Sequence, residues 1–140
     1  MDGKNNTFTV ASAKAAAKKG KLRDWAIQFL EGIGGNQTTA DKIKEFEKEG
    51  TLEWTGPILF DLNKLTPMVS SEEGEEFYKP NWEKDSNAMK EAILGGWEPP
   101  PLISTDWEGQ SNVLPDGNHR WKALQKAGLQ KYWTIFFRKK

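Results

Sequence analysis

The sequence predicts an α+β protein in which a small mixed sheet follows an N-terminal helical arm. Apolar residues recur at helical spacing in the first 50 residues, and short β-rich runs alternate with helical patterns after residue 54. The length of 140 residues suits one ordinary domain. We expect the helical arm to cover residues 1–52 and the sheet domain residues 53–140, with the two packed as one compact unit.

The helical arm is predicted from propensity and period. From Ala11 to Gly20 the chain is rich in Ala and Lys, which favour helix. One apolar face then predicts a helix from residue 21 to 33. Its members are Leu22, Trp25, Ala26, Phe29, Leu30 and Ile33. Gly34-Gly35-Asn36 ends this helix, and Thr38 or Thr39 is expected to cap the next one.

The sheet domain is predicted from β-rich runs separated by turn residues. The expected strands are residues 57–62, 102–104, 113–114 and 132–137. Between them we expect loops at 66–85 and 106–112, and a helix at 86–94 capped by Ser86 and closed by Gly95-Gly96.

A further helix follows the third predicted strand, and its end is well specified. Gly128 stands where a left-handed residue belongs, and Leu129 can then contact Leu124 in the Schellman arrangement. Counting back from this end puts Asn118 at the N-cap, with His119 in the first turn.

Composition excludes several classes of function. The 20 Lys and Arg residues balance 20 Asp and Glu, so net charge gives no argument for nucleic acid or membrane. The absence of Cys excludes disulfides, thiolate metal sites and thiol nucleophiles. No apolar stretch approaches the roughly 20 residues that span a bilayer, and no signal-peptide core is apparent. We therefore expect a cytoplasmic protein without membrane partners.

Residues 116–120 read Asp-Gly-Asn-His-Arg and include the only histidine of the chain. N–H groups of a first helical turn and the helix dipole attract anions, above all phosphate. Arg120 adds a planar fork for phosphate or carboxylate, and His119 a donor or proton carrier. Gly117 permits a sharp turn and close approach of a ligand. The predicted phosphate-binding residues are therefore Gly117, Asn118, His119 and Arg120.

Asp116 is the unusual member, because a carboxylate repels phosphate. It is expected to orient His119 or Arg120, to bind a sugar hydroxyl, or to hold a divalent metal. Asp116 and His119 are the candidate catalytic residues. The alternative is a plain turn followed by a capped helix, and the residues alone leave both interpretations open.

The motif also resembles a known signature. Asp116-Gly117-Asn118-His119-Arg120, with Ala123-Leu124 after it, is similar to the Asp-Gly-x-x-Arg-x-x-Ala-Leu signature of the ParB/sulfiredoxin-like superfamily. Pro100-Pro101-Leu102-Ile103 resembles the strand that precedes the motif in that family. The resemblance covers residues 54–138 and implies a small mixed sheet of ParB/sulfiredoxin type. Residues 20–36 look like the helical preface of some small bacterial ParB-like proteins.

The family includes CTP-binding partitioning proteins, ATP-dependent sulfiredoxins, ADP-dependent serine kinases and proteins labelled nuclease. The resemblance implies a nucleotide with Mg²⁺ whose phosphates contact Gly117 to Arg120, with nucleotide hydrolysis or phosphotransfer as candidate activities. Sulfiredoxin chemistry is excluded, because Asn118 stands where the reactive Cys would be. The partitioning motif, Gly-Glu-Arg-Arg, also differs. The kinase branch is closer, and its carboxylate base would come from the acidic loop Glu72, Glu73, Glu75 and Glu76.

Other features have two interpretations each. The loop Glu72–Glu76 is either a Mg²⁺ ligand set or a solvated charge run. The basic residues Lys14, Lys18, Lys19, Lys21 and Arg23 either follow a nucleic-acid backbone or form a solvated helix face. Trp82 and Trp107 are candidate base-stacking residues or packing residues. Two alternatives therefore stand beside nucleotide binding: a DNA-binding or nuclease accessory protein, and a non-catalytic interaction module.

Overall fold

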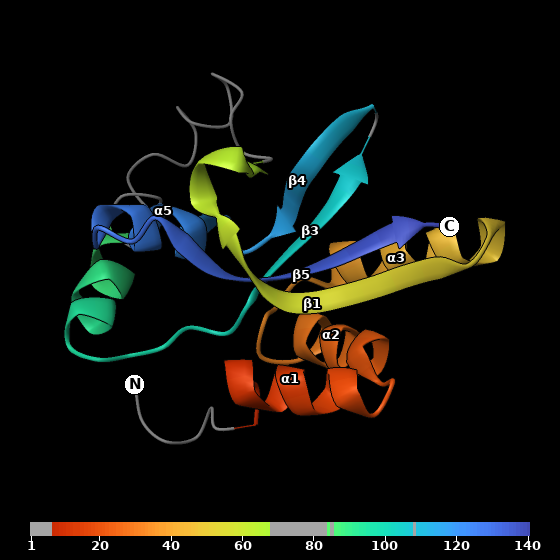
Figure 1. The fold of residues 1–140 in the computed structure, drawn as a ribbon, viewed down its shortest axis with the longest axis horizontal. Helices are drawn as coiled ribbons and strands as arrows, with labels where there is room; N and C mark the ends of the chain where they lie inside the picture. The colour runs from red at the N-terminus through yellow and green to blue at the C-terminus, as the bar shows by residue number, and fades with distance from the viewer. Residues whose placement is uncertain (1–6, 68–83, 85, 108) are drawn as a thin grey trace.

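The computed structural model describes residues 7–67, 84, 86–107 and 109–140. Its centre is a five-stranded sheet with the order β1-β5-β3-β4-β2. The strands are β1 (Leu52–Asp61), β2 (Thr66–Pro67), β3 (Leu102–Trp107), β4 (Gln110–Asp116) and β5 (Lys131–Lys139). β1 and β5 are antiparallel, as are β3 and β4, whereas β3 pairs with β5 and β2 with β4 in parallel. The predicted α+β class with a mixed sheet is confirmed (Figure 1).

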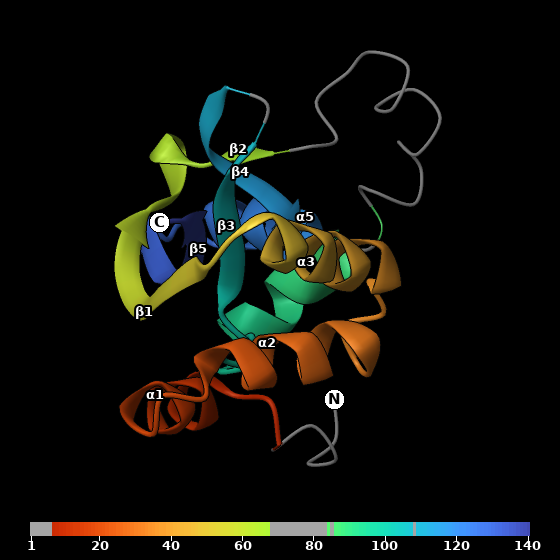
Figure 2. The same cartoon turned by 90° about the vertical axis from the view of Figure 1, so that its right-hand side faces the viewer.

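Helices cover both faces of the sheet. α1 (Val10–Lys18), α2 (Leu22–Glu31) and α3 (Gln37–Glu49) form the helical arm, and α5 (Asn118–Lys126) follows β4. Side chains alternate along β5, so that Ile135 and Phe137 pack with the arm while Tyr132 and Phe136 pack in a second cluster with Leu124 of α5. Figure 2 shows α3 in front of the strands and α5 behind them, with α2 below the strands.

The arm and the sheet share one hydrophobic core. Ile43 and Leu30 of the arm are fully buried in the same cluster as Ile103, Ile135 and Phe137 of β3 and β5. The arm therefore completes the packing of one sheet face. The proposed boundary between residues 52 and 53 stays a prediction, and β1 begins at Leu52.

The structure corrects the predicted ends of two helices. α2 stops at Glu31, two residues early, and Ile33 is 51% exposed instead of buried. The cap of α3 is Asn36 and neither predicted threonine, because the Asn36 Oδ1 accepts a hydrogen bond from the backbone N–H of Thr39 at 3.1 Å. Asn is as good a cap as Ser or Thr, and the Gly-Gly-Asn stop of one helix also starts the next.

Each of the four predicted strands is shorter than the observed strand. β1 starts at Leu52 instead of residue 57, with a register shift between Thr55 and Ile58. The predicted loop at 106–112 is mostly a hairpin, because β3 continues to Trp107 and β4 begins at Gln110. The hairpin strands contain many polar residues, so the sequence has no β-rich run that would indicate them.

The helix predicted at 86–94 is present, but Ser86 is itself helical and Lys84 is helical as well, so Ser86 is not its cap. Within the described ranges, no helix is long and apolar enough to cross a membrane.

Candidate functional site

The helix α5 ends as its sequence predicts. Gly128 has φ 92°, and its N–H donates to the carbonyl of Gln125 at 3.0 Å. The N–H of Leu129 donates to the carbonyl of Leu124 at 3.0 Å. These two bonds are the Schellman pair, so this prediction is confirmed.

The start of α5 differs from the prediction by one residue. Gly117, with φ 93° and ψ 18°, is the N-cap, and Asn118 is the first helical residue. The Asn118 amide donates instead to the carbonyl of Leu114 at 2.9 Å. A Cβ on Gly117 would lie 2.9 Å from Nη2 of Arg120 and 3.0 Å from Leu102, and a left-handed φ strains any other residue. Gly117 therefore sets the helix start and makes room for the Arg120 side chain.

Arg120 is held inside the protein. Its side chain is buried, and Nη2 pairs with Asp116 Oδ2 at 2.7 Å. Nη1 donates to the carbonyls of Pro100 and Pro101, each at 3.0 Å, and the guanidinium carbon lies 5.1 Å from the ring centre of Phe29. These bonds use three of the five N–H donors of an arginine, which leaves two. Burial lowers the pKa of the guanidinium, and the Asp116 charge opposes that shift.

Asp116 is held from two sides. Its Oδ2 accepts from Arg120, and its Oδ1 accepts from the side-chain amide of Asn36 at 3.0 Å. The same amide donates to the carbonyl of Pro115 at 3.0 Å, where the hydroxyl of Thr39 also donates at 3.1 Å. Of the roles considered for Asp116, the structure shows that it orients Arg120.

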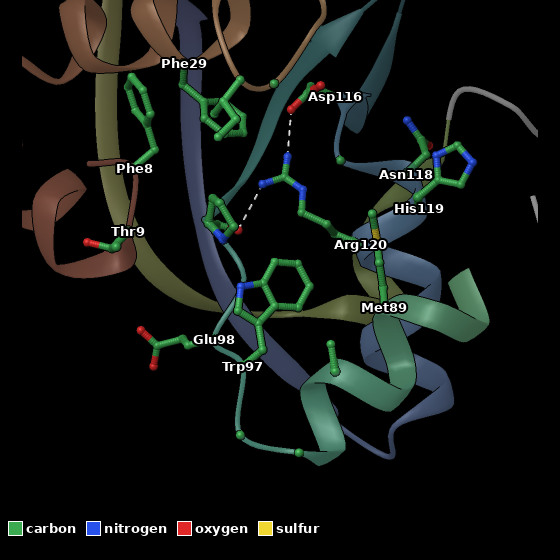
Figure 3. Close-up of a pocket in the computed structure, with 17 residues that line it drawn as sticks. Phe8, Thr9, Phe29, Met89, Trp97, Glu98, Asp116, Asn118, His119 and Arg120 are labelled. Atoms are coloured by element: carbon green, nitrogen blue, oxygen red, sulfur yellow. Dashed lines mark hydrogen bonds and ion pairs between the residues drawn. The ribbon is translucent and has the colours of Figure 1, made fainter. Parts of the chain in front are cut away.

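A cleft of about 910 Å³ lies over this network. All five motif residues, Asp116 to Arg120, line it. The arm contributes Phe8, Thr9 and Phe29, and the segment after the 86–94 helix contributes Trp97 and Glu98. Figure 3 shows Arg120 reaching toward Asp116, with Phe29 and Trp97 beside it and with Asn118 and His119 on the other side of the α5 start.

A glycine turn positions Trp97. The N–H of Trp97 donates to the carbonyl of Ala92 at 2.9 Å, and that of Gly96 to Ile93 at 3.0 Å. Gly96 has φ 108°, so this is a second Schellman end. The predicted Gly95-Gly96 stop thereby directs Trp97 and Glu98 to the cleft.

The structure gives Asp116 little capacity for a metal. Both of its oxygens are engaged by Arg120 and Asn36. In the part of the chain that the structure describes, no three His, Cys, Asp or Glu side chains are grouped to hold a metal ion. The other metal candidate, the loop Glu72–Glu76, lies outside the described residues. Asp116 and His119 as catalytic residues stay a prediction.

The remaining candidates that the structure describes do not line the cleft. Lys14 Nζ sits 3.4 Å from the ring centre of Trp133, and Arg23 binds Glu47 through two hydrogen bonds. Two of the five basic residues considered for nucleic-acid binding are thus engaged within the protein. Trp107 packs edge-to-face on Phe46 and lines a separate cavity of about 400 Å³. Trp82 lies outside the described residues.

The sequence alone does not assign five residues to the site: Asn36, Trp97, Glu98, Pro100 and Pro101. Asn36 was interpreted only as part of a helix stop, and nothing local indicates a partner 80 residues away. Trp97 and Glu98 follow a recognised glycine stop, which could have indicated an exposed, fixed position. The carbonyls of Pro100 and Pro101 carry no side-chain signal at all.

No family model and no curated protein matches the chain. Among solved structures, the chain is similar to a Pnob8-like ParB-N domain, with 18% sequence identity and a TM-score of 0.43. The likeness covers 63% of this chain and 30% of that chain.

Proposed function

We propose that the cleft at the start of α5 binds a small phosphate-bearing ligand, and specifically a nucleoside di- or triphosphate with Mg²⁺. One observation carries the proposal: the first turn of α5 forms a wall of a cleft of about 910 Å³ that also has aromatic walls. Small-molecule sites typically measure about 300–1,000 Å³ and combine apolar walls with a few polar groups.

The phosphates would lie at the first turn of α5. The N-terminal end of a helix carries a partial positive charge, and Gly117 brings no side chain that would cover it. Asp116 neutralises much of the Arg120 charge, so the guanidinium mainly shapes the site. His119 is the lining residue suited to a hydrogen bond or to proton transfer near neutral pH.

The nucleoside would lie toward the opposite walls. Trp97 and Phe8 offer ring surfaces for a base, whereas the buried ring of Phe29 backs the site by packing against Trp25 and Arg120. The exposed carboxylate of Glu98 is placed to accept hydrogen bonds from ribose hydroxyls or a base amino group. A Mg²⁺ ion would enter bound to the phosphates, because both oxygens of Asp116 are already engaged.

The test is a thermal-shift and calorimetric panel of ribonucleoside di- and triphosphates, with and without Mg²⁺. We expect at least one nucleotide to raise the melting temperature, since a ligand that binds only the folded state stabilises it. His119→Ala should weaken this ligand. Lys122→Ala, a control on the same helix outside the cleft lining, should not. A folded wild type that responds to no nucleotide overturns the proposal.

The same samples test two other activities, nucleotide hydrolysis and DNA binding. Phosphate release measured on wild type and His119→Ala reports hydrolysis, for which His119 is the candidate proton carrier. Gel shifts at low salt report DNA binding, which strengthens as salt falls.

A further inference from the structure

The helical arm is joined to the motif by side chains as well as by the core. Asn36, at the turn between α2 and α3, donates to Asp116 Oδ1 and to the carbonyl of Pro115, each at 3.0 Å. Phe29, near the end of α2, places its ring 5.1 Å from the Arg120 guanidinium carbon. The arm therefore contacts both members of the Asp116–Arg120 pair.

A chain of contacts leads from Asn36 to the cleft. Asn36 fixes Asp116, and Asp116 fixes Arg120 at 2.7 Å. Arg120 in turn ties the first turn of α5 to the carbonyls of Pro100 and Pro101. A side chain 80 residues from Asp116 in sequence thus sets the geometry of the motif helix and of the proline segment below it.

We propose that Asn36 is a positioning residue for this cleft, acting on the ligand through Asp116 and Arg120. The inference rests on the proposed function and adds the coupling between the helical arm and the ligand. Asn36 itself does not line the cleft. Its effect on affinity would come from the amide-to-carboxylate bond, not from its second task as the cap of α3.

Two substitutions separate those tasks. Asn36→Asp and Asn36→Ser both keep an oxygen that can cap Thr39, because Asp and Ser are good N-cap residues. Asn36→Ser replaces the amide with a shorter hydroxyl, so the amide bonds to Asp116 and to the carbonyl of Pro115 are both lost. Asn36→Asp replaces that donor with a second carboxylate facing Asp116, so the pair repels at neutral pH.

The matched control is Thr39→Val. Thr39 belongs to the same interface, and its hydroxyl donates to Pro115 but not to Asp116. This substitution weakens docking of the arm and leaves the carboxylate contact intact. A role in folding alone would make all three variants alike in affinity.

Affinity is measured by calorimetry with each of the four ribonucleoside triphosphates plus Mg²⁺, between about pH 5 and 8, where His and perturbed carboxyl groups titrate. We expect Asn36→Ser to bind about tenfold more weakly than wild type at every pH, as for loss of a hydrogen bond to a charged group. Asn36→Asp should bind more weakly still at the upper pH and recover relative to wild type as the pH falls. A proton shared between two neighbouring carboxylates restores the missing donor. Thr39→Val should stay within about twofold of wild type, since it alters no contact to Asp116.

Each affinity is expressed relative to wild type at the same pH. Arg120 on the other oxygen of Asp116, Tyr132 near Arg120, and His119 and Glu98 in the cleft lining are unchanged in every variant. Titration of these groups and of the ligand phosphates therefore largely cancels in the ratio. The pH-dependent ratio should belong to Asn36→Asp alone.

The outcomes distinguish this inference from the proposed function. A folded wild type that binds no nucleotide overturns the proposed function and the inference with it. A wild type that binds while Asn36→Asp and Asn36→Ser match its affinity at every pH overturns the inference alone. Equal losses in Thr39→Val and the Asn36 variants, without a pH-dependent ratio, overturn it as well, because docking of the arm would then suffice. Thermal unfolding of each variant verifies that the compared samples are folded.

Discussion

The ion pair of Asp116 and Arg120 is buried, with side chains 10% and 8% exposed. A buried charge that loses its partner is costly, because water cannot replace the lost interaction. Asp116→Asn keeps the shape and removes the charge. We expect it to lower the free energy of unfolding by about 3–5 kcal/mol, measured by urea denaturation.

The control for that prediction is an exposed pair. Lys42 and Glu45 lie 3.2 Å apart with side chains 42% and 65% exposed. Glu45→Gln should cost at most about 1 kcal/mol, because water screens the pair. Equal small losses in both variants would show that Asp116 and Arg120 contribute no more than a surface pair.

Tyr132 should make the protein sensitive to alkaline pH. Burial raises the pKa of its hydroxyl, and the Glu98 charge raises it further, while Arg120 lowers it. The hydroxyl donates to the carbonyl of Pro99, so the neutral form fits the folded state. A folded-state pKa above the unfolded value gives stability that is complete below about pH 10 and is lost as the pH rises beyond it.

Absorbance of the phenolate tests this expectation. Tyr78 is the only other tyrosine in the sequence, so Tyr78→Phe leaves Tyr132 as the single reporter. In denaturant, Tyr132 should ionise near pH 10, and in the native protein only at higher pH. Ionisation at the same pH in both states would contradict the burial of this hydroxyl.

The two ends of α5 give a prediction about the helix itself. Gly117 and Gly128 both have left-handed φ angles, 93° and 92°. Around Gly128 nothing lies within 4 Å of an added Cβ, whereas at Gly117 that atom would approach Arg120 at 2.9 Å and Leu102 at 3.0 Å.

Gly128→Ala should therefore cost only the backbone strain, about 1–2 kcal/mol. Gly117→Ala should cost that strain and roughly 1–3 kcal/mol more for overpacking. The difference between the two, measured by chemical denaturation, reports the close approach of Arg120 and Leu102. Equal costs would mean that both side chains move aside freely.

The two ends of α5 also differ in how well the sequence predicts them. The Gly128-Leu129 end depends on residues within one turn, so its Schellman bonds were predicted correctly. The start depends on how Arg120 folds back over Gly117, a contact with no local pattern, and Asn118 was therefore wrongly assigned as the cap. The same holds for the cleft. The sequence predicts its wall at residues 116–120, whereas the contact of Asn36 with Asp116 depends on how the helical arm packs against the sheet.

The arm and the sheet should unfold together, because the core does not separate them. Leu30 of α2 is fully buried in the cluster that includes Ile103 and Ile135 of the sheet. Without the arm, one face of β3 and β5 would expose these side chains to water. Leu30→Ala should cost about 2–5 kcal/mol through lost burial and a residual cavity.

Native-state hydrogen exchange shows which elements lose stability in Leu30→Ala. In one cooperative unit, Leu30→Ala lowers the protection of the slowest amides in β5 as much as in α2, since both exchange through global unfolding. Ile33→Ala is the control, because Ile33 follows the same helix and is 51% exposed. It should leave both sets nearly unchanged. If only α2 amides lose protection in Leu30→Ala, the arm opens by itself. The contact of Asn36 with Asp116 would then break and reform while the sheet stays folded.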